Sequence, residues 1–164
     1  MNHTARKPFT AMRLLKPALV AALLWPAVAG AQRAKGLEGT WDVTVTLRNC
    51  ATNDPIRSFP RMITFAKGGT LSEWAAAGLE VAPVARGSGQ GSWEYLGQSD
   101  FSYSLKFLRL TPYGGPDGSI SEIRLLEVNQ AGDHYSADGV AVITFANGTT
   151  SPQLCATEAG TRVF

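Results

Sequence analysis

The sequence has few of the residues from which metal centres and catalytic triads are built. It contains two cysteines, Cys50 and Cys155, and two histidines, His3 and His134. After the leader described below, His134 is the one histidine left, so a two-cysteine metal site would lack ligands. No Ser/His/Asp or Cys/His combination can be assembled around it. We therefore expect no catalytic residues, metal or cofactor, and interpret His134, beside Asp133 at a predicted turn, as a solvated loop residue.

Long apolar runs are missing beyond the first thirty residues. Residues 1–31 combine four basic residues, an apolar run at 18–28 and the small residues Ala29-Gly30-Ala31, which is typical of a secretory signal peptide with its cleavage site. The run is too short to span a membrane, and no cysteine follows the cleavage site to accept an acyl anchor. We expect export to the periplasm or the extracellular space, without a membrane anchor.

Clusters of basic residues are missing as well. The net charge of +2 for the whole sequence depends on the leader, because residues 32–164 hold eleven Lys and Arg against thirteen Asp and Glu. These basic residues are scattered, which excludes the electrostatic footprint of a nucleic-acid binder. Residues 32–164 are enough for a single domain with a core. In an oxidising compartment Cys50 and Cys155 are expected to form a disulfide, with two buried free thiols as the alternative.

No stretch of ten residues keeps a helical period, so the sequence predicts an all-β fold. Turn signals separate eight segments of alternating or β-branched residues. The connections between them are alternately long and short, as in an up-and-down barrel with tight turns at one end and longer loops at the other, the mouth; the last connection, 147–149, is expected at the mouth but tight. The expected strands are 38–50, 59–66, 70–76, 88–96, 101–111, 119–128, 133–146 and 150–162.

The first predicted strand carries a family resemblance. Gly39-x-Trp41 followed by strict alternation, together with Arg162 near the end, resembles the calycin superfamily, in particular lipocalin-like barrels. The family's usual Thr-Asp-Tyr signature is missing. The resemblance implies an eight-stranded antiparallel up-and-down barrel whose last strand pairs with its first. It also implies that Trp41 closes the barrel floor and that Arg162 packs across it in a cation–π contact. Pairing Cys50 opposite Cys155 would place Arg162 opposite Val43.

Strand parity predicts which side chains face the barrel interior. The segment 101–111 has one apolar face, which Arg109 continues toward the mouth, and Arg61 falls on the inner face of 59–66. Glu73 is the nearest expected internal partner for these two arginines. A bulge that turns Arg109 outward and Leu108 and Leu110 inward is the alternative. The expected inner residues of the two segments are Phe101, Tyr103, Leu105, Phe107, Phe59, Ile63 and Phe65.

Two aromatic positions and one loop stay open to more than one interpretation. The faces Leu71/Glu73 and Ser72/Trp74 of segment 70–76 are equally acceptable as the inner one. Trp93, with Tyr95, is interpreted as cavity lining or as plain core. The connection 78–85 is unusually apolar and is interpreted as a lid or as a partner-binding patch.

The predicted barrel favours a binding protein for a small, mostly hydrophobic ligand, since calycin barrels hold one such molecule inside. Arginines near the mouth predict an anionic or strongly polar head group. One alternative is a protein-interaction or inhibitor module that uses the mouth loops. A less favoured alternative is a cyclase or isomerase resembling allene oxide cyclases, with Glu73, Tyr103 and Arg109 as candidates. The expected ligand-binding residues are Arg61, Phe65, Glu73, Trp74, Trp93, Tyr103, Leu105, Phe107 and Arg109.

Overall fold

Alternation of buried and exposed residues continues through most of the chain after residue 38, and every such stretch is a strand. The computed structural model describes residues 36–75 and 85–164, so the predicted signal peptide lies outside the described residues. No helix that could cross a membrane is found in the described ranges. The strands are β1 (Gly39–Arg48), β2 (Pro55–Ala66), β3 (Thr70–Ala75), β4 (Ala85–Arg86), β5 (Gly89–Gly97), β6 (Asp100–Leu110), β7 (Pro116–Val128), β8 (His134–Thr144) and β9 (Leu154–Arg162).

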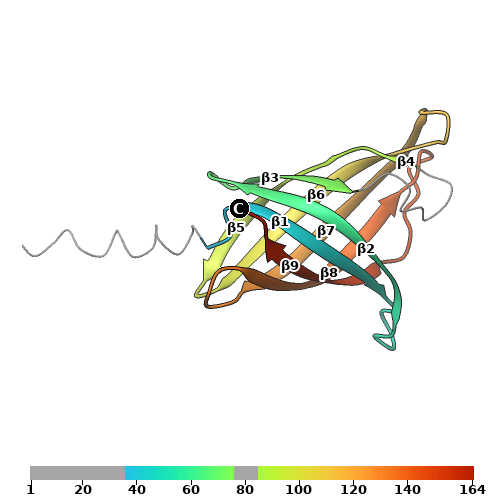
Figure 1. Ribbon diagram of the computed structural model, residues 1–164. Helices are drawn as coiled ribbons and strands as arrows, with labels where there is room; N and C mark the ends of the chain where they lie inside the picture. Colours follow the sequence, from blue (N-terminus) through green and yellow to red (C-terminus); the bar gives the residue numbers. More distant parts are fainter. Residues whose placement is uncertain (1–35, 76–84) are drawn as a thin grey trace, which may run out of the picture.

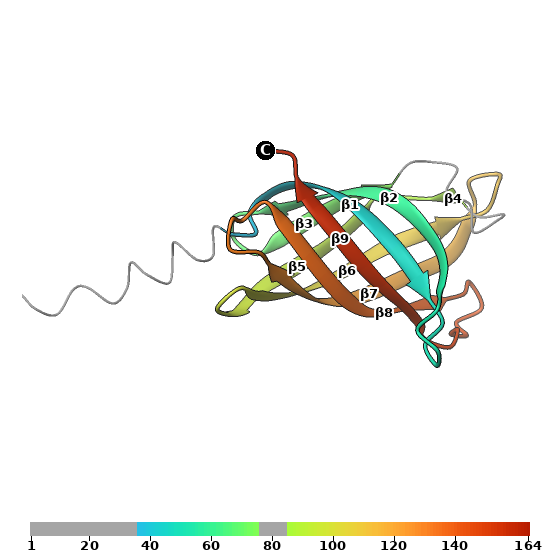
Figure 2. The same ribbon diagram turned by 60° about the horizontal axis from the view of Figure 1, so that its bottom comes forward.

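These strands form one closed antiparallel sheet, which confirms the predicted all-β, eight-stranded up-and-down barrel. The ladder runs β4-β6-β5-β3-β2-β1-β9-β8-β7, and β7 pairs back with β6. The two-residue β4 was not predicted; it lies on β6 beyond the end of β5 and extends the same wall. The tilted strands wind around a common axis (Figure 1), and β9 lies between β1 and β8 (Figure 2). Closure leaves none of these eight strands with a long open edge.

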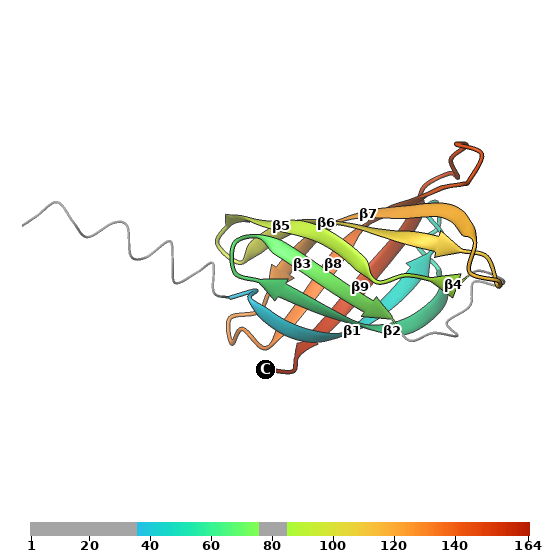
Figure 3. The same cartoon turned by 90° about the horizontal axis from the view of Figure 1, so that it is seen from above.

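The two ends of the barrel differ in their connections, as predicted. The short turns 67–69, 98–99 and 129–133 lie at one end, which we call the floor, and the chain terminus marked C lies there too (Figure 1). The strands β1, β3, β6 and β8 end at the opposite end, the mouth. Figure 3 shows β3 and β5 side by side, with β4 at the mouth.

Two strand boundaries differ from the expectation by four residues. β2 begins at Pro55, within the segment 51–58 that was expected to be a loop. Proline has no N–H to donate to a neighbouring strand. Pro60 is tolerated because β3 pairs with β2 only from Arg61 onward, so no described hydrogen bond to β3 is lost at Pro60. β9 begins at Leu154, because the turn at Asn147-Gly148 closes on Phe145 and the chain leaves the ladder again before residue 154. The β8–β9 connection is therefore longer than predicted.

The floor is closed by the contact that the calycin resemblance implies. The Arg162 guanidinium carbon lies 4.3 Å from the centroid of the Trp41 ring. Its nitrogens donate to the carbonyl oxygens of Gly132 (2.6 Å), Glu38 (2.5 Å) and Gly36. Gly39 has a φ of 131°, and a Cβ there would come within 2.7 Å of Arg162, which explains the glycine two residues before the tryptophan.

The disulfide between Cys50 and Cys155 is present, with 5.2 Å between the Cα atoms, and it ties β9 to the β1–β2 connection at the mouth. The predicted register was wrong by two residues. Cys155 pairs with Arg48, and Arg162 pairs directly with Trp41 rather than with Val43. The reason is that β1 ends at Arg48, so Cys50 reaches its partner from the turn beyond the strand.

Candidate functional site

The inner face of β6 is the one predicted from parity. Phe101, Tyr103, Leu105 and Phe107 are buried and alternate with more exposed neighbours. The rings nearest the floor pack edge to face, with 5.7 Å between the centroids of Phe65 and Tyr103. Related contacts join Phe65 to Trp93, Trp93 to Phe101, and Trp41 to Tyr135. The expected ligand-binding residues Phe65 and Trp93 therefore belong to a packed aromatic layer.

Above this layer lies a ring of four buried charges, which we call the charge ring: Arg61, Glu122, Arg124 and Glu158. Arg61 donates to Glu122 (2.9 Å) and to Glu158. Arg124 donates to the same two carboxylates, at 3.2 Å and 2.9 Å. Each arginine thus bridges both acids, and the two positive and two negative charges balance. Such a ring stabilises the barrel only as a complete set, because removing one member leaves buried charge without a partner.

Two tyrosines connect the charge ring to the aromatic layer. The Tyr103 hydroxyl donates to Glu158 at 2.8 Å, and the Tyr135 hydroxyl donates at 3.4 Å. Burial, and then the negative charge of Glu158, raises the pKa of both tyrosines well above the usual value, so they stay neutral donors. Burial raises the pKa of Glu122, but Arg61 and Arg124 beside it outweigh that effect and lower the pKa overall. Glu122 is therefore ionised at neutral pH.

Glycine makes room for these long side chains. At Gly139, on the β8 position opposite Arg124, a Cβ would lie 2.9 Å from the Arg124 side chain and 2.0 Å from the carbonyl oxygen of Ile123. Eight strands enclose an interior that side chains just fill. Two arginines fit across it because a neighbouring strand contributes no side chain at that level.

A second polar cluster, which we call the mouth cluster, consists of Glu73, Arg86 and Phe107. Arg86 donates to the Glu73 carboxylate, and its guanidinium carbon lies 3.7 Å from the centroid of Phe107. Burial raises the pKa of Glu73, although Arg86 opposes the shift. The expectation that Glu73 would pair with Arg61 or Arg109 was wrong, because Glu73 faces β4, a strand that the sequence did not predict.

Arg109 continues the inner parity of β6 to the mouth, as expected, and the register shifts between Leu108 and Leu110 without turning it fully outward. It forms an ion pair with Asp117 (2.8 Å) and lies 5.2 Å from the centroid of Phe145. Its charge is thus already balanced by a carboxylate of the next strand.

Four buried polar atoms have no hydrogen-bond partner within the described ranges: Arg61 Nε, Glu73 Oε1, Arg86 Nε and Arg109 Nη1. They comprise three donors and one acceptor. They belong to the charge ring, the mouth cluster and the mouth itself, whereas the floor contributes none. Since buried polar groups nearly always have partners, these atoms mark where a further polar group would be accommodated.

Trp74 does not face the interior. The pairing of Met62 with Trp74 and of Ile63 with Glu73 directs Glu73 inward, so Trp74 lies on the outer face with 58% of its surface exposed. There it borders a shallow hollow of about 330 Å³ on the outside of the barrel, lined by Met62, Thr64, Ser72, Glu73, Trp74, Ser88 and Gln90. Of the two faces that the sequence left open, Leu71/Glu73 is the inner one, so the expectation that Trp74 contributes to a ligand site inside the barrel was wrong.

The three residues considered for an enzyme have separate partners in the described structure. Glu73 pairs with Arg86, Tyr103 with Glu158, and Arg109 with Asp117. His134 is exposed beside the 129–133 turn. The described residues hold no group of three or more potential metal ligands. The apolar connection 78–85 lies outside the described residues except for Ala85.

The sequence analysis missed Arg86, Glu122, Arg124, Tyr135 and Glu158. A signal for two of them is present in β7, where Glu122 and Arg124 have the same parity as Leu126 and Val128. The competing face of β7 contains Ile123 and Leu125, which are exposed. Hydrophobicity therefore favoured the wrong face, and only the ladder with β6 and β8 decides between them.

A search against models of known protein families finds no match for this chain, and a search of curated protein sequences finds none either. The closed eight-stranded antiparallel barrel, with its first and last strands paired, is compatible with a calycin-like fold.

Proposed function

We propose that the protein is an exported, calycin-like binding protein that holds a small amphipathic molecule in the mouth half of its barrel. The proposal depends on one observation: buried polar atoms without a described partner occur from the charge ring to the mouth. Three of the four are arginine N–H groups, which suit an acceptor-rich head group such as a carboxylic acid. The signal-like leader and the Cys50–Cys155 disulfide support export.

The charge ring sets how deep such a ligand can reach. Below the ring the interior is filled by packed aromatic side chains. The head group would therefore lie near Glu73 and Arg86, and near Arg109, which pairs with Arg86 across β4 and β6. The apolar part would lie against Phe107 and Phe59. Because the arginine charges are already balanced by carboxylates, the head group is recognised by donated hydrogen bonds more than by net charge.

Calorimetric titration of the disulfide-bonded protein with a fatty acid and with the alcohol of equal chain length tests the proposal. Arg109→Ala should weaken binding of the acid more than binding of the alcohol, by about 1 to 3 kcal/mol for a desolvated charged hydrogen bond. The matched control is Trp74→Leu, which changes the outer face and should leave both affinities unchanged.

Equal losses for the acid and the alcohol would show that Arg109 does not contact the head group. Mass spectrometry of protein purified from its own host provides an independent check, since a bound ligand should co-purify. The proposal is refuted if neither lipid binds and no small molecule co-purifies.

A further inference from the structure

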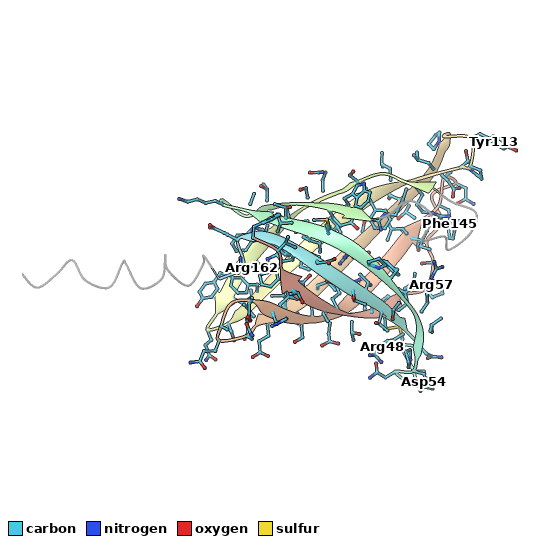
Figure 4. All side chains as sticks on the ribbon, in the orientation of Figure 1. Arg48, Asp54, Arg57, Tyr113, Phe145 and Arg162 are labelled. Carbon is cyan, nitrogen blue, oxygen red and sulfur yellow. A yellow bond between two sulfur atoms is a disulfide. The ribbon has the colours of Figure 1, made fainter. Side chains whose placement is uncertain are left out.

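Two arginines lie directly opposite each other at the mouth. Arg86 of β4 pairs with Arg109 of β6, so the two side chains leave the same face of the sheet side by side. Each guanidinium lies near an aromatic ring, Arg86 at 3.7 Å from the centroid of Phe107 and Arg109 at 5.2 Å from that of Phe145. Figure 4 shows Phe145 at the end of the barrel away from Arg162. We call Arg86 and Arg109 the arginine pair.

The arginine pair has fewer acceptors than donors. Like charges in directly opposite positions of a ladder repel each other, so an acceptor shared by both stabilises them. One carboxylate serves each arginine: Glu73 accepts from Arg86, and Asp117 accepts from Arg109 at 2.8 Å. Each arginine also keeps one buried N–H without a partner among the described residues, Arg86 Nε and Arg109 Nη1. Two such donors on neighbouring guanidinium groups suit the several oxygens of one oxyanion.

The two carboxylates differ in their exposure to water. The Glu73 side chain is fully buried, whereas that of Asp117 is 30% exposed. Burial removes the hydration that stabilises a charged carboxylate, so Glu73 gains more than Asp117 from taking up a proton. In agreement with this, burial raises the pKa of Glu73. The oxygen Glu73 Oε1 has no partner in the described chain, so a proton bound there breaks no described hydrogen bond.

Charged groups on three neighbouring strands act on Glu73. Arg86 of β4 and Arg61 of β2 favour its ionised form, and Glu122 of β7 opposes it. When Glu73 is neutral, Arg61 keeps its ion pair with Glu122, but Arg86 has no other carboxylate partner within the described ranges. A proton on Glu73 therefore leaves the charge of Arg86 unbalanced. The neighbours from β5 and β6 carry no charge: Gly89, which is opposite Glu73 in the ladder, and Leu105, which lies beside Gly89.

We propose that the arginine pair binds one oxyanion, a carboxylate or a sulfonate, and that the Glu73 carboxylate competes with it for Arg86. Binding of the oxyanion is then accompanied by the uptake of one proton at Glu73. This inference rests on the proposed function, because the oxyanion is the head group of the amphipathic ligand. It adds a regulation to that site: an anionic ligand is held more tightly in acid than at alkaline pH, whereas a neutral ligand is not.

Calorimetric titration of the disulfide-bonded protein with octanesulfonate, from acidic to mildly alkaline pH, tests the competition. The sulfonate stays ionised throughout, so a change in its affinity reports a group on the protein. The affinity should fall as the pH rises through the pKa of Glu73, by up to about tenfold per pH unit for one coupled proton. Titrations in two buffers of different ionisation enthalpy should show that one proton is taken up. Octanol, which has no charge, should show neither effect.

Glu73→Gln removes the competing charge and keeps the shape of the side chain. This variant should bind octanesulfonate at alkaline pH about as tightly as the unchanged protein binds it in acid, and without proton uptake. The matched control is Glu94→Gln, which removes an exposed carboxylate from the outer face of β5. It should keep both the affinity and the pH dependence of the unchanged protein.

An affinity for octanesulfonate that does not change with pH, or a pH dependence that Glu73→Gln retains, would overturn the competition. The proposed function would survive that result as long as octanol binds. Methanesulfonate carries the same head group without the apolar chain. If it binds with proton uptake while octanol does not bind, the oxyanion site is supported and the amphipathic ligand is refuted. If none of the three compounds binds at any pH, both proposals are overturned.

Discussion

The floor and the mouth of this barrel are closed by different means. At the floor, Arg162 stacks on Trp41 and donates to three carbonyl oxygens, above rings that pack edge to face. At the mouth, a disulfide ties β9 to the β1–β2 connection, and four buried polar atoms between the charge ring and the mouth have no partner in the described chain. The floor satisfies its polar groups and the mouth does not.

The difference indicates a division of labour along the barrel axis. Apolar packing and satisfied hydrogen bonds give the floor its stability. Buried ionisable groups near the mouth are costly to fold around, and such groups concentrate where proteins bind other molecules. The charge ring separates the two regions.

The largest expected effect tests whether the charge ring is a unit. Glu158→Gln leaves Arg61 and Arg124 with one carboxylate between them, and we expect a loss of about 3 to 5 kcal/mol in the free energy of unfolding by urea. Asp138→Asn, on an exposed position of β8, should change it by less than about 0.5 kcal/mol. A loss below about 1 kcal/mol for Glu158→Gln would mean that the four charges do not depend on one another for stability.

Removing the disulfide tests whether the two ends are independent. The double variant Cys50→Ser and Cys155→Ser should lose about 2 to 4 kcal/mol of unfolding free energy, because the bridge closes a long loop. The near-ultraviolet circular dichroism of the floor tryptophans should be unchanged in the folded variant. A changed spectrum would show that the floor packing depends on the mouth.

Arg162→Lys tests the floor itself. Lysine cannot donate to three carbonyl oxygens while lying flat on Trp41, so we expect a loss of about 2 kcal/mol in thermal unfolding experiments. Arg48→Lys at the mouth is the matched control, since Arg48 donates to Thr157 and to the Asn53 carbonyl at a more exposed site. Similar losses for both variants would contradict a special role for the floor arginine.

The pH dependence of stability should have opposite signs for two buried glutamates. The folded-state pKa of Glu73 is raised, so its contribution to stability is present below the ordinary value of 4.5 and is lost as the pH rises through the raised pKa. The folded-state pKa of Glu122 is lowered, so its contribution is present above 4.5 and is lost as the pH falls through the lowered pKa.

Urea unfolding of Glu73→Gln and Glu122→Gln across acidic pH measures these slopes. Relative to the unchanged protein, Glu73→Gln should gain stability as the pH rises above 4.5, and Glu122→Gln should lose stability as the pH rises toward 4.5. Comparing slopes removes the constant cost of each substitution. If the stability of both variants, relative to the unchanged protein, changed with pH in the same direction, the mouth cluster and the charge ring would not differ in the sign of their pKa shifts.

The smallest effect is expected for Trp74→Ala, which should change the free energy of unfolding by less than about 0.5 kcal/mol because the ring is mostly exposed. The comparison is Trp93→Ala in the aromatic layer, for which about 3 to 5 kcal/mol is expected. A large loss for Trp74→Ala would show that the outer face of β3 is covered in solution.

Much of the fold could be predicted because its signals are local. Alternation in segment 101–111 identifies the inner face of β6, and turn residues determine the alternating connections. The pairing of β1 with β9 required the calycin resemblance, since strands so distant in sequence share no local signal. The register was missed because a strand that ends two residues early moves the cysteine into a turn.

The candidate site was less predictable, for a physical reason. Sequence patterns assign charged residues to the solvent side. Glu122, Arg124 and Glu158 are buried because they and Arg61 neutralise one another across β2, β7 and β9. Arg61 was placed inside correctly, but its partners lie on β7 and β9. Such compensation is a property of the closed sheet and does not appear in any single segment.

The place of β9 in the sheet determines when the chain can fold. While residues 154–162 of a nascent chain are still inside the ribosome or a translocation channel, Cys155, Glu158 and Arg162 cannot make their contacts in the barrel. In such a chain β1 and β8 each have an unpaired edge, and Arg61 and Arg124 have no ion pair with Glu158. The floor is also open. For a protein exported as proposed, the chain therefore stays unfolded, and able to pass through the channel, until β9 emerges. It becomes a rigid barrel only after β9 has emerged on the far side.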